Sequence, residues 1–175
     1  MKDMRNTYNL SAPYKASEKE ISYLYDIASY QFSETVSSCL FSAYPYFLIQ
    51  RSTTTNKIRN ILTPDNKLFL VLRAQDNLFS LTEISGMLIK NCTQRPEFRF
   101  VVRNEISKFI REGKNVFCKF VVDADENIRY GDEVLVVNED DELLAIGRAR
   151  VSGEEVKQYK RGIAVIVKRE INSEY

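Results

Sequence analysis

Histidine is absent from the 175 residues of the chain. Imidazole is the usual general base near neutral pH, the usual partner of serine and cysteine nucleophiles, and the commonest metal ligand in proteins. Its absence removes those three kinds of site, while carboxylate or lysine chemistry remains possible. We therefore expect a protein that is not an enzyme by itself, that has no metal site and that needs no cofactor.

Cysteine and long apolar runs are also scarce. The three cysteines, Cys39, Cys92 and Cys118, are far apart and odd in number, which argues against a disulfide framework and against a paired-cysteine zinc site. Free cysteines of this kind behave as small core residues. No apolar run approaches the roughly 20 residues that span a bilayer, and residues 1–15 lack the apolar core of a secretory signal. We expect a cytoplasmic protein without a membrane partner.

Charge is balanced overall but segregated along the chain. The net charge is +1, yet the stretch 123–142 holds nine acids and one base. The stretch 157–169 holds five bases and no acid, and the stretch 51–73 holds five bases and one acid. Such segregation can form a local basic face on a neutral protein, which is what phosphate binding requires. On charge alone, ordinary solvated faces are the favoured explanation of the pattern.

The first half of the chain has the pattern of a small α+β domain. Ser17 and Glu20 have the spacing of a helix capping box, and apolar residues then recur at helical spacing. Thr63–Asn66 has the composition of a tight turn between two β-like runs, which predicts a hairpin. We expect helices over 18–32, 34–41 and 82–90, and strands over 47–50, 57–62, 67–73 and 78–81.

The second half has short strands punctuated by glycine. The segment 91–97 is the best linker candidate, and Pro96 within it opens the next β-like run. Short strands at this spacing favour a small closed barrel, which removes exposed sheet edges. We expect strands over 98–102, 116–122, 133–138, 143–151 and 162–168, with helices over 104–111 and 154–159. The predicted divisions are a flexible N-terminus over 1–15, an N-terminal domain over 16–95 and a C-terminal barrel domain over 96–170.

Four ordered segments in this half resemble a PUA domain, a small RNA-binding pseudo-barrel. They are FIREGKNVFCKFV (109–121), IRYGDEVLVV (128–137), LLAIGRARVS (143–152) and KRGIAVIVK (160–168). The resemblance implies that Gly131 and Asp132 make the turn into a strand and that Gly147 lets two strands approach closely. The fold class expected is therefore α+β, with a small antiparallel sheet and helices followed by a PUA pseudo-β-barrel.

The resemblance extends into the first half. SYQFSETVSSCLF (29–41) and the stretch 54–89 are similar to the domain that precedes PUA in archaeal archaeosine tRNA-guanine transglycosylases and archaeosine synthases. The chain departs from the family at Ser33–Thr35, where the family tends to have glycines, and at Asp76-Asn77, where it tends to have Asp-Gly. The catalytic barrel of the family has no counterpart here, so the chain resembles the RNA-binding C-terminal portion as a separate polypeptide.

The PUA resemblance also implies an RNA-binding surface. That surface is formed around the first helix of the domain, the glycine loop after it, and the last strand with its preceding short helix. Bases from two distant segments would gather there, while the acidic stretch 123–142 would lie elsewhere. The residues expected to bind RNA are Lys108, Arg111, Gly113, Lys114, Asn115, Lys119, Lys157, Lys160, Arg161 and Gly162.

Three functions are consistent with these patterns. The first is a stand-alone accessory subunit of a split tRNA-guanine transglycosylase or archaeosine synthase, which presents the acceptor stem and 3′ end of tRNA to a separate catalytic subunit. The second is a ribosome-associated or translation factor built on a PUA domain, without a role in modification. The third, an enzyme in its own right, is disfavoured by the lack of histidine and of a glycine-rich phosphate loop.

Overall fold

The computed structural model describes residues 9–172 and separates into two compact units. The first unit ends at Ser85 and the second begins at Gly86, so the division falls within helix α3 (Glu83–Cys92). Of the N-terminal segment 1–15 that was predicted to be flexible, residues 1–8 lie outside the described part, and Tyr14–Lys15 form strand β1. Among residues 9–172, no helix is both long enough and apolar enough to cross a membrane.

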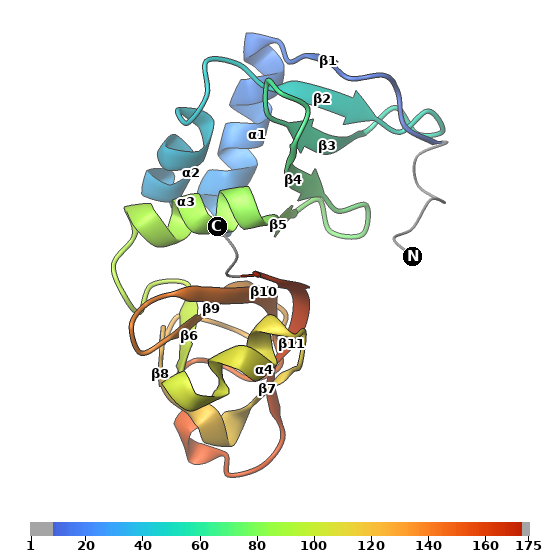
Figure 1. Ribbon diagram of the computed structural model, residues 1–175. Coiled ribbons are helices and arrows are strands. Elements are labelled where there is room, and N and C mark those ends of the chain that lie inside the picture. The colour runs from blue at the N-terminus through green and yellow to red at the C-terminus, as the bar shows by residue number, and fades with distance from the viewer. Residues whose placement is uncertain (1–8, 173–175) are drawn as a thin grey trace. The chain divides into compact units, whose positions relative to one another are not determined.

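The first unit is an antiparallel sheet of five strands, in the order in which they follow along the chain, with two helices on one face (Figure 1). Leu24 and Leu40 of the helices and Phe69 of the sheet are fully buried and belong to its core. The predicted hairpin is confirmed by the pairing of β3 with β4. The elements are α1 (Glu18–Gln31), α2 (Glu34–Phe41), β2 (Leu48–Arg51), β3 (Ile58–Leu62), β4 (Leu68–Leu72) and β5 (Phe79–Leu81).

Helix α1 begins with the predicted capping box. The Ser17 hydroxyl accepts a hydrogen bond from the Glu20 amide at 3.1 Å, and the Glu20 carboxylate accepts one from the Ser17 amide at 3.0 Å. The same carboxylate accepts from Arg51 Nη2 at 2.7 Å and from the Tyr14 hydroxyl at 2.8 Å. A capping residue predicted from local spacing therefore also joins α1 to strands β1 and β2.

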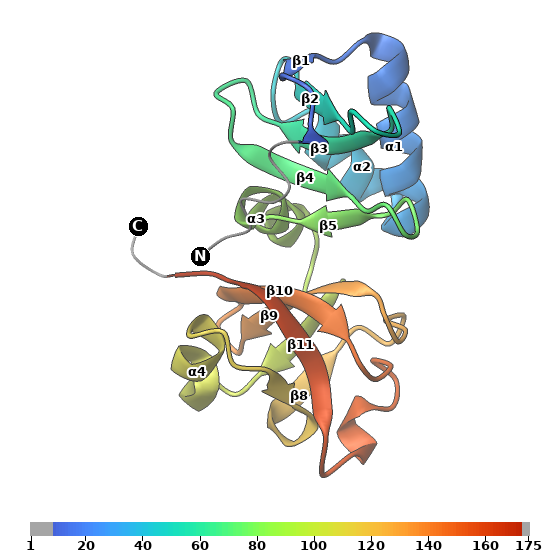
Figure 2. The ribbon, with the colours of Figure 1, turned by 90° about the vertical axis from the view of Figure 1, so that its right-hand side faces the viewer.

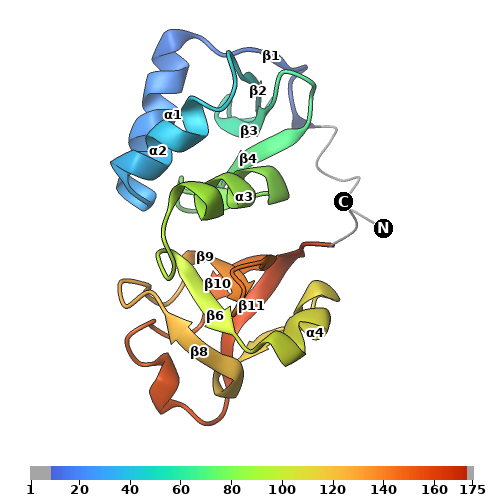
Figure 3. The ribbon, with the colours of Figure 1, turned by 60° about the vertical axis from the view of Figure 1, so that its left-hand side comes forward.

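The second unit is a six-stranded sheet in the order β7-β11-β10-β9-β6-β8, with helix α4 (Ser107–Arg111) packed against β10 and β11 (Figures 2 and 3). All its strand pairs are antiparallel except β6 with β9, which are parallel. The strands are β6 (Arg99–Val102), β7 (Val116–Phe117), β8 (Val121–Ala124), β9 (Glu133–Asn138), β10 (Leu143–Ala149) and β11 (Ile163–Glu170). This sheet confirms the predicted pseudo-barrel, and the two units together confirm the α+β class.

The predicted strand 116–122 is wrong, because a 3-10 turn, Cys118–Phe120, separates β7 from β8. These two strands are the opposite edges of the six-stranded sheet. Only three residues join them, so the two edges must curl toward one another. The turn therefore connects the two edge strands directly, which brings the barrel close to closure. The predicted helix 154–159 is likewise shorter, and only Val156–Gln158 form a 3-10 turn.

Two glycines have the backbone roles that were predicted for them. Gly131 has φ +88°, a left-handed conformation that favours glycine, and it lies in the turn before β9. At Gly147, a Cβ atom would lie 2.3 Å from the carbonyl oxygen of Ile166 on β11. Real Cβ atoms do not approach an oxygen that closely, so a side chain here would push β10 and β11 apart.

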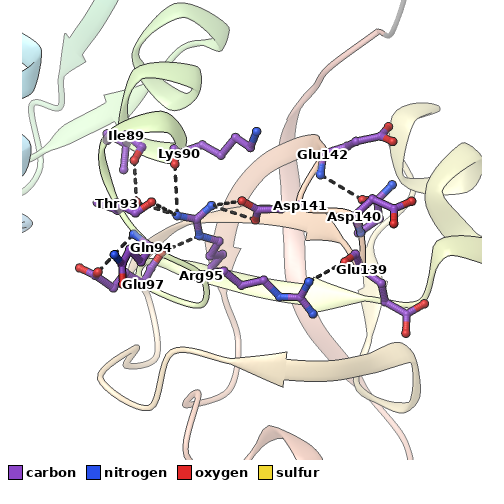
Figure 4. A network of polar contacts seen from close by, with 12 residues as sticks. Ile89, Lys90, Thr93, Gln94, Arg95, Glu97, Glu139, Asp140, Asp141 and Glu142 are labelled. Carbon is purple, nitrogen blue, oxygen red and sulfur yellow. Dashed lines mark hydrogen bonds and ion pairs between the residues drawn. The ribbon is translucent and has the colours of Figure 1, made fainter.

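Arg99 is fully buried in the second unit and joins three segments. Its guanidinium donates to both Asp141 carboxylate oxygens at 2.9 and 3.0 Å, and also to the Lys90 carbonyl at the end of α3 and to Thr93. Figure 4 shows Lys90, Thr93 and Asp141 converging on this point. The segment 91–97, predicted as a linker, is thereby held on the turn between β9 and β10.

Candidate nucleic-acid interface

An aromatic hollow of about 240 Å³ lies in the second unit beside α4. Two of its rings are open to solvent: Phe109 is 56% exposed and Phe117 is 46% exposed. Exposed rings around a hollow are a surface on which unpaired bases can stack, because every base has a π face. The lining residues are Ile106, Phe109, Ile110, Lys114, Asn115, Phe117 and Phe120.

Phe109 is exposed, although regular helical spacing over 104–111 would place it inward with Ile106 and Ile110. Ile106 belongs to a 3-10 turn, Asn104–Ile106, which precedes the five-residue helix α4. Three residues per turn in that segment, rather than 3.6, change the phase of the helix face. Ile106 and Ile110 are buried, whereas Phe109 faces solvent at the rim of the aromatic hollow.

The glycine loop supplies the polar rim of the aromatic hollow. Gly113, with φ +91°, follows the C-cap residue of α4, and Lys114 and Asn115 come next. The side-chain oxygen of Asn115 accepts a hydrogen bond from the Val167 amide of β11 at 3.0 Å. Asn115 therefore fixes the loop to the barrel, and the exposed side chain of Lys114 stands at the rim of the hollow.

Pairing of β7 with β11 brings the end of the segment 157–162, the second segment predicted to bind RNA, beside Phe117. Phe117 lies opposite Ile163, and the Gly162 carbonyl accepts a hydrogen bond from the Cys118 amide at 2.9 Å. Lys160 and Arg161 are exposed in the turn just before β11, and Gly162 there has φ +94°. Two segments that are about 45 residues apart in the sequence thus form one surface.

Lys119 lies in the 3-10 turn between β7 and β8, not in a strand as predicted. Its ammonium group lies 5.0 Å from the centre of the Phe120 ring, a distance at which a cation is attracted to a ring face. Phe120 also lines the aromatic hollow. Lys119 therefore places a positive charge beside the rings.

Lys108 and Arg111 lie on a different hollow of about 590 Å³, together with Glu105 and Glu112. The Arg111 guanidinium donates to the Glu142 carboxylate at 2.8 Å, and this hydrogen bond lowers the pKa of Glu142. Two acids share this hollow with the two bases, so its charge is mixed.

Lys157 forms an ion pair with Asp123 at 3.5 Å. Asp123 and Glu142 both belong to the acidic stretch 123–142, which was expected to lie away from the basic segments. That expectation is wrong at these two positions, because the fold pairs Asp123 with Lys157 and Glu142 with Arg111. Within the described residues 9–172, no group of three or more Cys, Asp or Glu side chains could hold a metal ion.

Sequence reasoning missed the aromatic part of the surface. Phe117 and Phe120 stand in a largely apolar run that has the pattern of a buried strand, so only charged residues, glycines and Asn115 were selected. In β7, Val116 is buried and Phe117, on the opposite face of the strand, is 46% exposed. Val116 and Phe117 are both apolar, so no local pattern in the sequence indicates which of the two faces solvent.

Two family models match the chain. The PUA domain matches residues 98–171, and the patch-forming domain C2 of tRNA-guanine transglycosylase matches residues 22–96. Among curated relatives, a tRNA-guanine(15) transglycosylase of Methanocaldococcus jannaschii is 42% identical over 69% of this chain and 18% of its own length. One of Thermococcus kodakarensis is 38% identical over 93% of this chain and 27% of its own length. The chain thus spans about a fifth to a quarter of such relatives.

Solved structures resemble both units of the chain. A hypothetical protein of Pyrococcus horikoshii OT3 has a TM-score of 0.72 and 25% identity, with 93% of this chain and 96% of that chain covered. A conserved PUA domain protein of Thermoplasma acidophilum has a TM-score of 0.63 and the same coverage, and at 17% identity it supports the fold alone. The chain is therefore a PUA-domain protein with a preceding C2 patch-forming domain, and it resembles the C-terminal portion of archaeal tRNA-guanine transglycosylases.

Proposed function

We propose that the chain is a tRNA-binding protein that acts as a non-catalytic accessory subunit of a tRNA-guanine transglycosylase or an archaeosine synthase. The relatives at 38 to 42% identity carry the transglycosylase activity in their names, and the part of them that matches is 18 to 27% of their length. The catalytic chain would be a separate partner. This chain would hold the RNA, with the acceptor stem and the 3′ end as the region bound.

The aromatic hollow is the observation that carries the proposal. Its rim has Phe109 and Phe117 exposed beside Lys114 and Asn115, and Lys160 and Arg161 stand in the adjoining turn. RNA is bound in proteins chiefly where unpaired bases stack on aromatic rings while cations meet the phosphates. An unpaired 3′ end has both features, and a duplex offers no free base to stack.

The exposed cations of this surface define its charge. In the described part of the chain, no ion pair engages Lys114, Lys119, Lys160 or Arg161. Arg111 and Lys157 are each paired with a carboxylate. We therefore assign the phosphate contacts to the unpaired cations, with Gly113 and Gly162 allowing close backbone approach, and we give Lys108, Arg111 and Lys157 a supporting position at the margin.

The test separates stacking from charge. Binding of a tRNA to the full chain is measured by fluorescence anisotropy at several salt concentrations, for wild type, Phe117→Ala and Lys160→Gln/Arg161→Gln. Loss of a stacked base costs about 1–3 kcal/mol, so Phe117→Ala should weaken binding about 5- to 150-fold without changing the salt dependence. The double charge variant should lower the slope of log K against log salt by about 0.7–0.9 for each phosphate that the protein no longer neutralises.

Tyr130→Ala is the matched control, because Tyr130 is 68% exposed in the same unit but does not line the aromatic hollow. It should bind tRNA as wild type does. Equal losses in Tyr130→Ala and Phe117→Ala would contradict the assigned surface, and absence of binding by wild type would contradict the function. Co-purification with ribosomes, and not with a transglycosylase, would favour a translation factor instead.

A further inference from the structure

A groove lined by tyrosine and proline lies in the first unit, between the first turns of α1, strand β1 and the loop that joins α2 to β2. Its volume is about 460 Å³, and the loop contributes Pro45, Tyr46 and Phe47 in succession. We call this the tyrosine groove. The lining residues are Lys15, Ala16, Glu18, Ile21, Ser22, Tyr25, Pro45, Tyr46 and Phe47.

The walls of the tyrosine groove are fixed by the fold. The Ala16 amide donates a hydrogen bond to the Phe47 carbonyl at 2.9 Å, which joins the segment before α1 to the loop before β2. The Phe47 ring is 2% exposed and packs against the rings of Phe41 and Phe69, with ring centres 5.6 and 5.2 Å away. A ligand in the groove would therefore meet walls whose positions are already set, which lowers the entropy lost on binding.

Polar groups without a partner stand around this apolar floor. Tyr46 is 39% exposed, and no hydrogen bond described among residues 9–172 engages its hydroxyl. The Lys15 ammonium lies 5.3 Å from the centre of the Tyr46 ring. Among the described ion pairs, none engages Lys15 or Glu18. The groove thus offers a ligand a hydroxyl donor, a cation and a carboxylate beside its rings.

These features fit an extended peptide that contains proline. A polyproline II segment has no internal backbone hydrogen bonds, so its carbonyls are open to donors such as the Tyr46 hydroxyl. Proline-rich segments of this kind bind in grooves that are lined by aromatic rings. An acidic and a basic residue beside the prolines would pair with Lys15 and Glu18. RNA would gain little from this groove, because the Glu18 carboxylate offsets the charge of Lys15.

Residues 1–175 do not supply such a segment themselves. Their prolines are isolated, since they lie at least 19 positions apart, and no stretch carries the two nearby prolines that a polyproline II turn would place together. A second copy of the same sequence is therefore a poor occupant. The four prolines are Pro13, Pro45, Pro64 and Pro96.

We propose that the tyrosine groove docks a proline-containing extended segment of the catalytic chain. The inference rests on the proposed function, which requires a separate catalytic partner, and it names the chemistry by which that partner is held. The first unit would bind the partner through this groove, while the aromatic hollow of the second unit binds the tRNA.

The experiment measures binding of labelled peptides to the full chain by fluorescence anisotropy. The probes are EPPAPK and its reverse, KPAPPE, so that both peptide directions are sampled, and EGGAGK is the control without proline. We expect saturable binding of a proline peptide and weaker binding of EGGAGK. Tyr46→Ala should weaken the proline peptide about 5- to 30-fold, as the loss of a tyrosine at the centre of an interface does, and should leave tRNA binding unchanged.

Charge reversal tests the assigned ion pair. Lys15→Glu should weaken the proline peptide about 2- to 5-fold, because an exposed ion pair contributes little. Replacing the glutamate of the peptide by lysine should restore its binding to that variant. Tyr30→Ala is the matched control, because Tyr30 is 85% exposed in the same unit and does not line the tyrosine groove. It should bind the peptide as wild type does.

The outcomes separate this inference from the proposed function. Absence of saturable binding by both proline peptides would overturn the inference, as would equal losses in Tyr46→Ala and Tyr30→Ala. In either case, tRNA binding that still depends on Phe117 would leave the proposed function standing. Weaker tRNA binding by Tyr46→Ala would assign the groove to RNA and overturn the inference. Dimers that Tyr46→Ala abolishes and that the peptides do not displace, measured by sedimentation, would assign it to a second copy and overturn the inference as well.

Discussion

At the scale of single residues, Arg99 has the most demanding environment. It is the largest side chain among the fully buried ones in the described chain, and a buried guanidinium is stable only when its donors are satisfied. Its partners are the Asp141 carboxylate and oxygens of Lys90, Thr93 and Glu97. A single side chain therefore holds the end of α3 and the β9–β10 turn together.

Replacing Arg99 should destabilise the chain strongly. Breaking one side of a buried charge pair costs about 3–5 kcal/mol, and the partial exposure of Asp141, at 33%, lowers this to about 2–4 kcal/mol. We expect Arg99→Met to lose that much free energy of unfolding, measured by urea denaturation. Arg99→Lys should rescue little, because an ammonium group lacks the planar fork that reaches several acceptors.

The control for Arg99 is Arg103→Met. Arg103 lies just after the same strand, is 54% exposed, and pairs with Glu105 at 3.7 Å. Exposed pairs of this kind contribute about 0–1 kcal/mol, so Arg103→Met should change stability little. A similar loss in both variants would mean that the Arg99 network does not hold these segments.

At the scale of elements, the start of α1 makes stability depend on pH. Burial disfavours the ionised form of Glu20, but hydrogen bonds from the Ser17 amide, Arg51 and Tyr14 outweigh it and lower the pKa of Glu20 to about 2. A carboxyl whose folded pKa lies below its unfolded value of about 4.3 stabilises the fold above that value. This contribution is lost as pH falls from about 4.5 to 2.

Glu20→Gln should therefore remove part of the acid sensitivity. Each unit of pKa shift corresponds to about 1.4 kcal/mol, and screening by solvent reduces the expected difference to about 1–2 kcal/mol. Wild type should exceed Glu20→Gln in stability at pH 6, and the two should converge near pH 2, as measured by urea denaturation across that range. Glu18→Gln, at an exposed position in the same helical turn, should change stability at pH 6 little. Parallel curves for wild type and Glu20→Gln would contradict the assignment.

Elements with a strong local signal could be predicted from the sequence, and those set by long-range contacts could not. The capping box at Ser17 and the turn at Thr63–Asn66 act over a few residues, so the helix and hairpin they define follow from spacing. The 3-10 turn at Cys118–Phe120 is required by barrel closure, since it joins the two sheet edges. No local pattern records that requirement, and the strand 116–122 was predicted to be continuous for this reason.

The candidate site divides in the same way. Gly113, Lys114 and Gly162 belong to loops whose composition indicates their conformation, and the structure gives both glycines positive φ values. The sequence could not show that Arg111 and Lys157 are each paired with a carboxylate. Their partners, Glu142 and Asp123, lie 31 and 34 positions away in the chain. The domain boundary between residues 95 and 96 stays a prediction beside the division into compact units at Ser85 and Gly86.

At the scale of the whole molecule, we expect binding without turnover. The residues that line the aromatic hollow are aliphatic, aromatic, lysine and asparagine, so that surface offers RNA no carboxylate to act as nucleophile or general base. The chain alone should incorporate no labelled guanine into tRNA, and incorporation should require a separate catalytic chain. Incorporation by the purified chain, abolished in a variant of one of its own acidic residues, would contradict an accessory role.

The gap between the two edge strands of the barrel, β7 and β8, couples RNA binding to the stability of the fold. Phe117 ends one sheet edge, and Phe120 belongs to the three-residue turn that leads to the other edge. A base stacked on both rings would hold the two sheet edges together. By mass action, a ligand at one hundred times its dissociation constant adds about 2.7 kcal/mol to the folded state. Amide hydrogens of β7 and β8 would then exchange with solvent more slowly in the complex than in the free protein. Bound tRNA would thus stabilise the edge strands of the barrel.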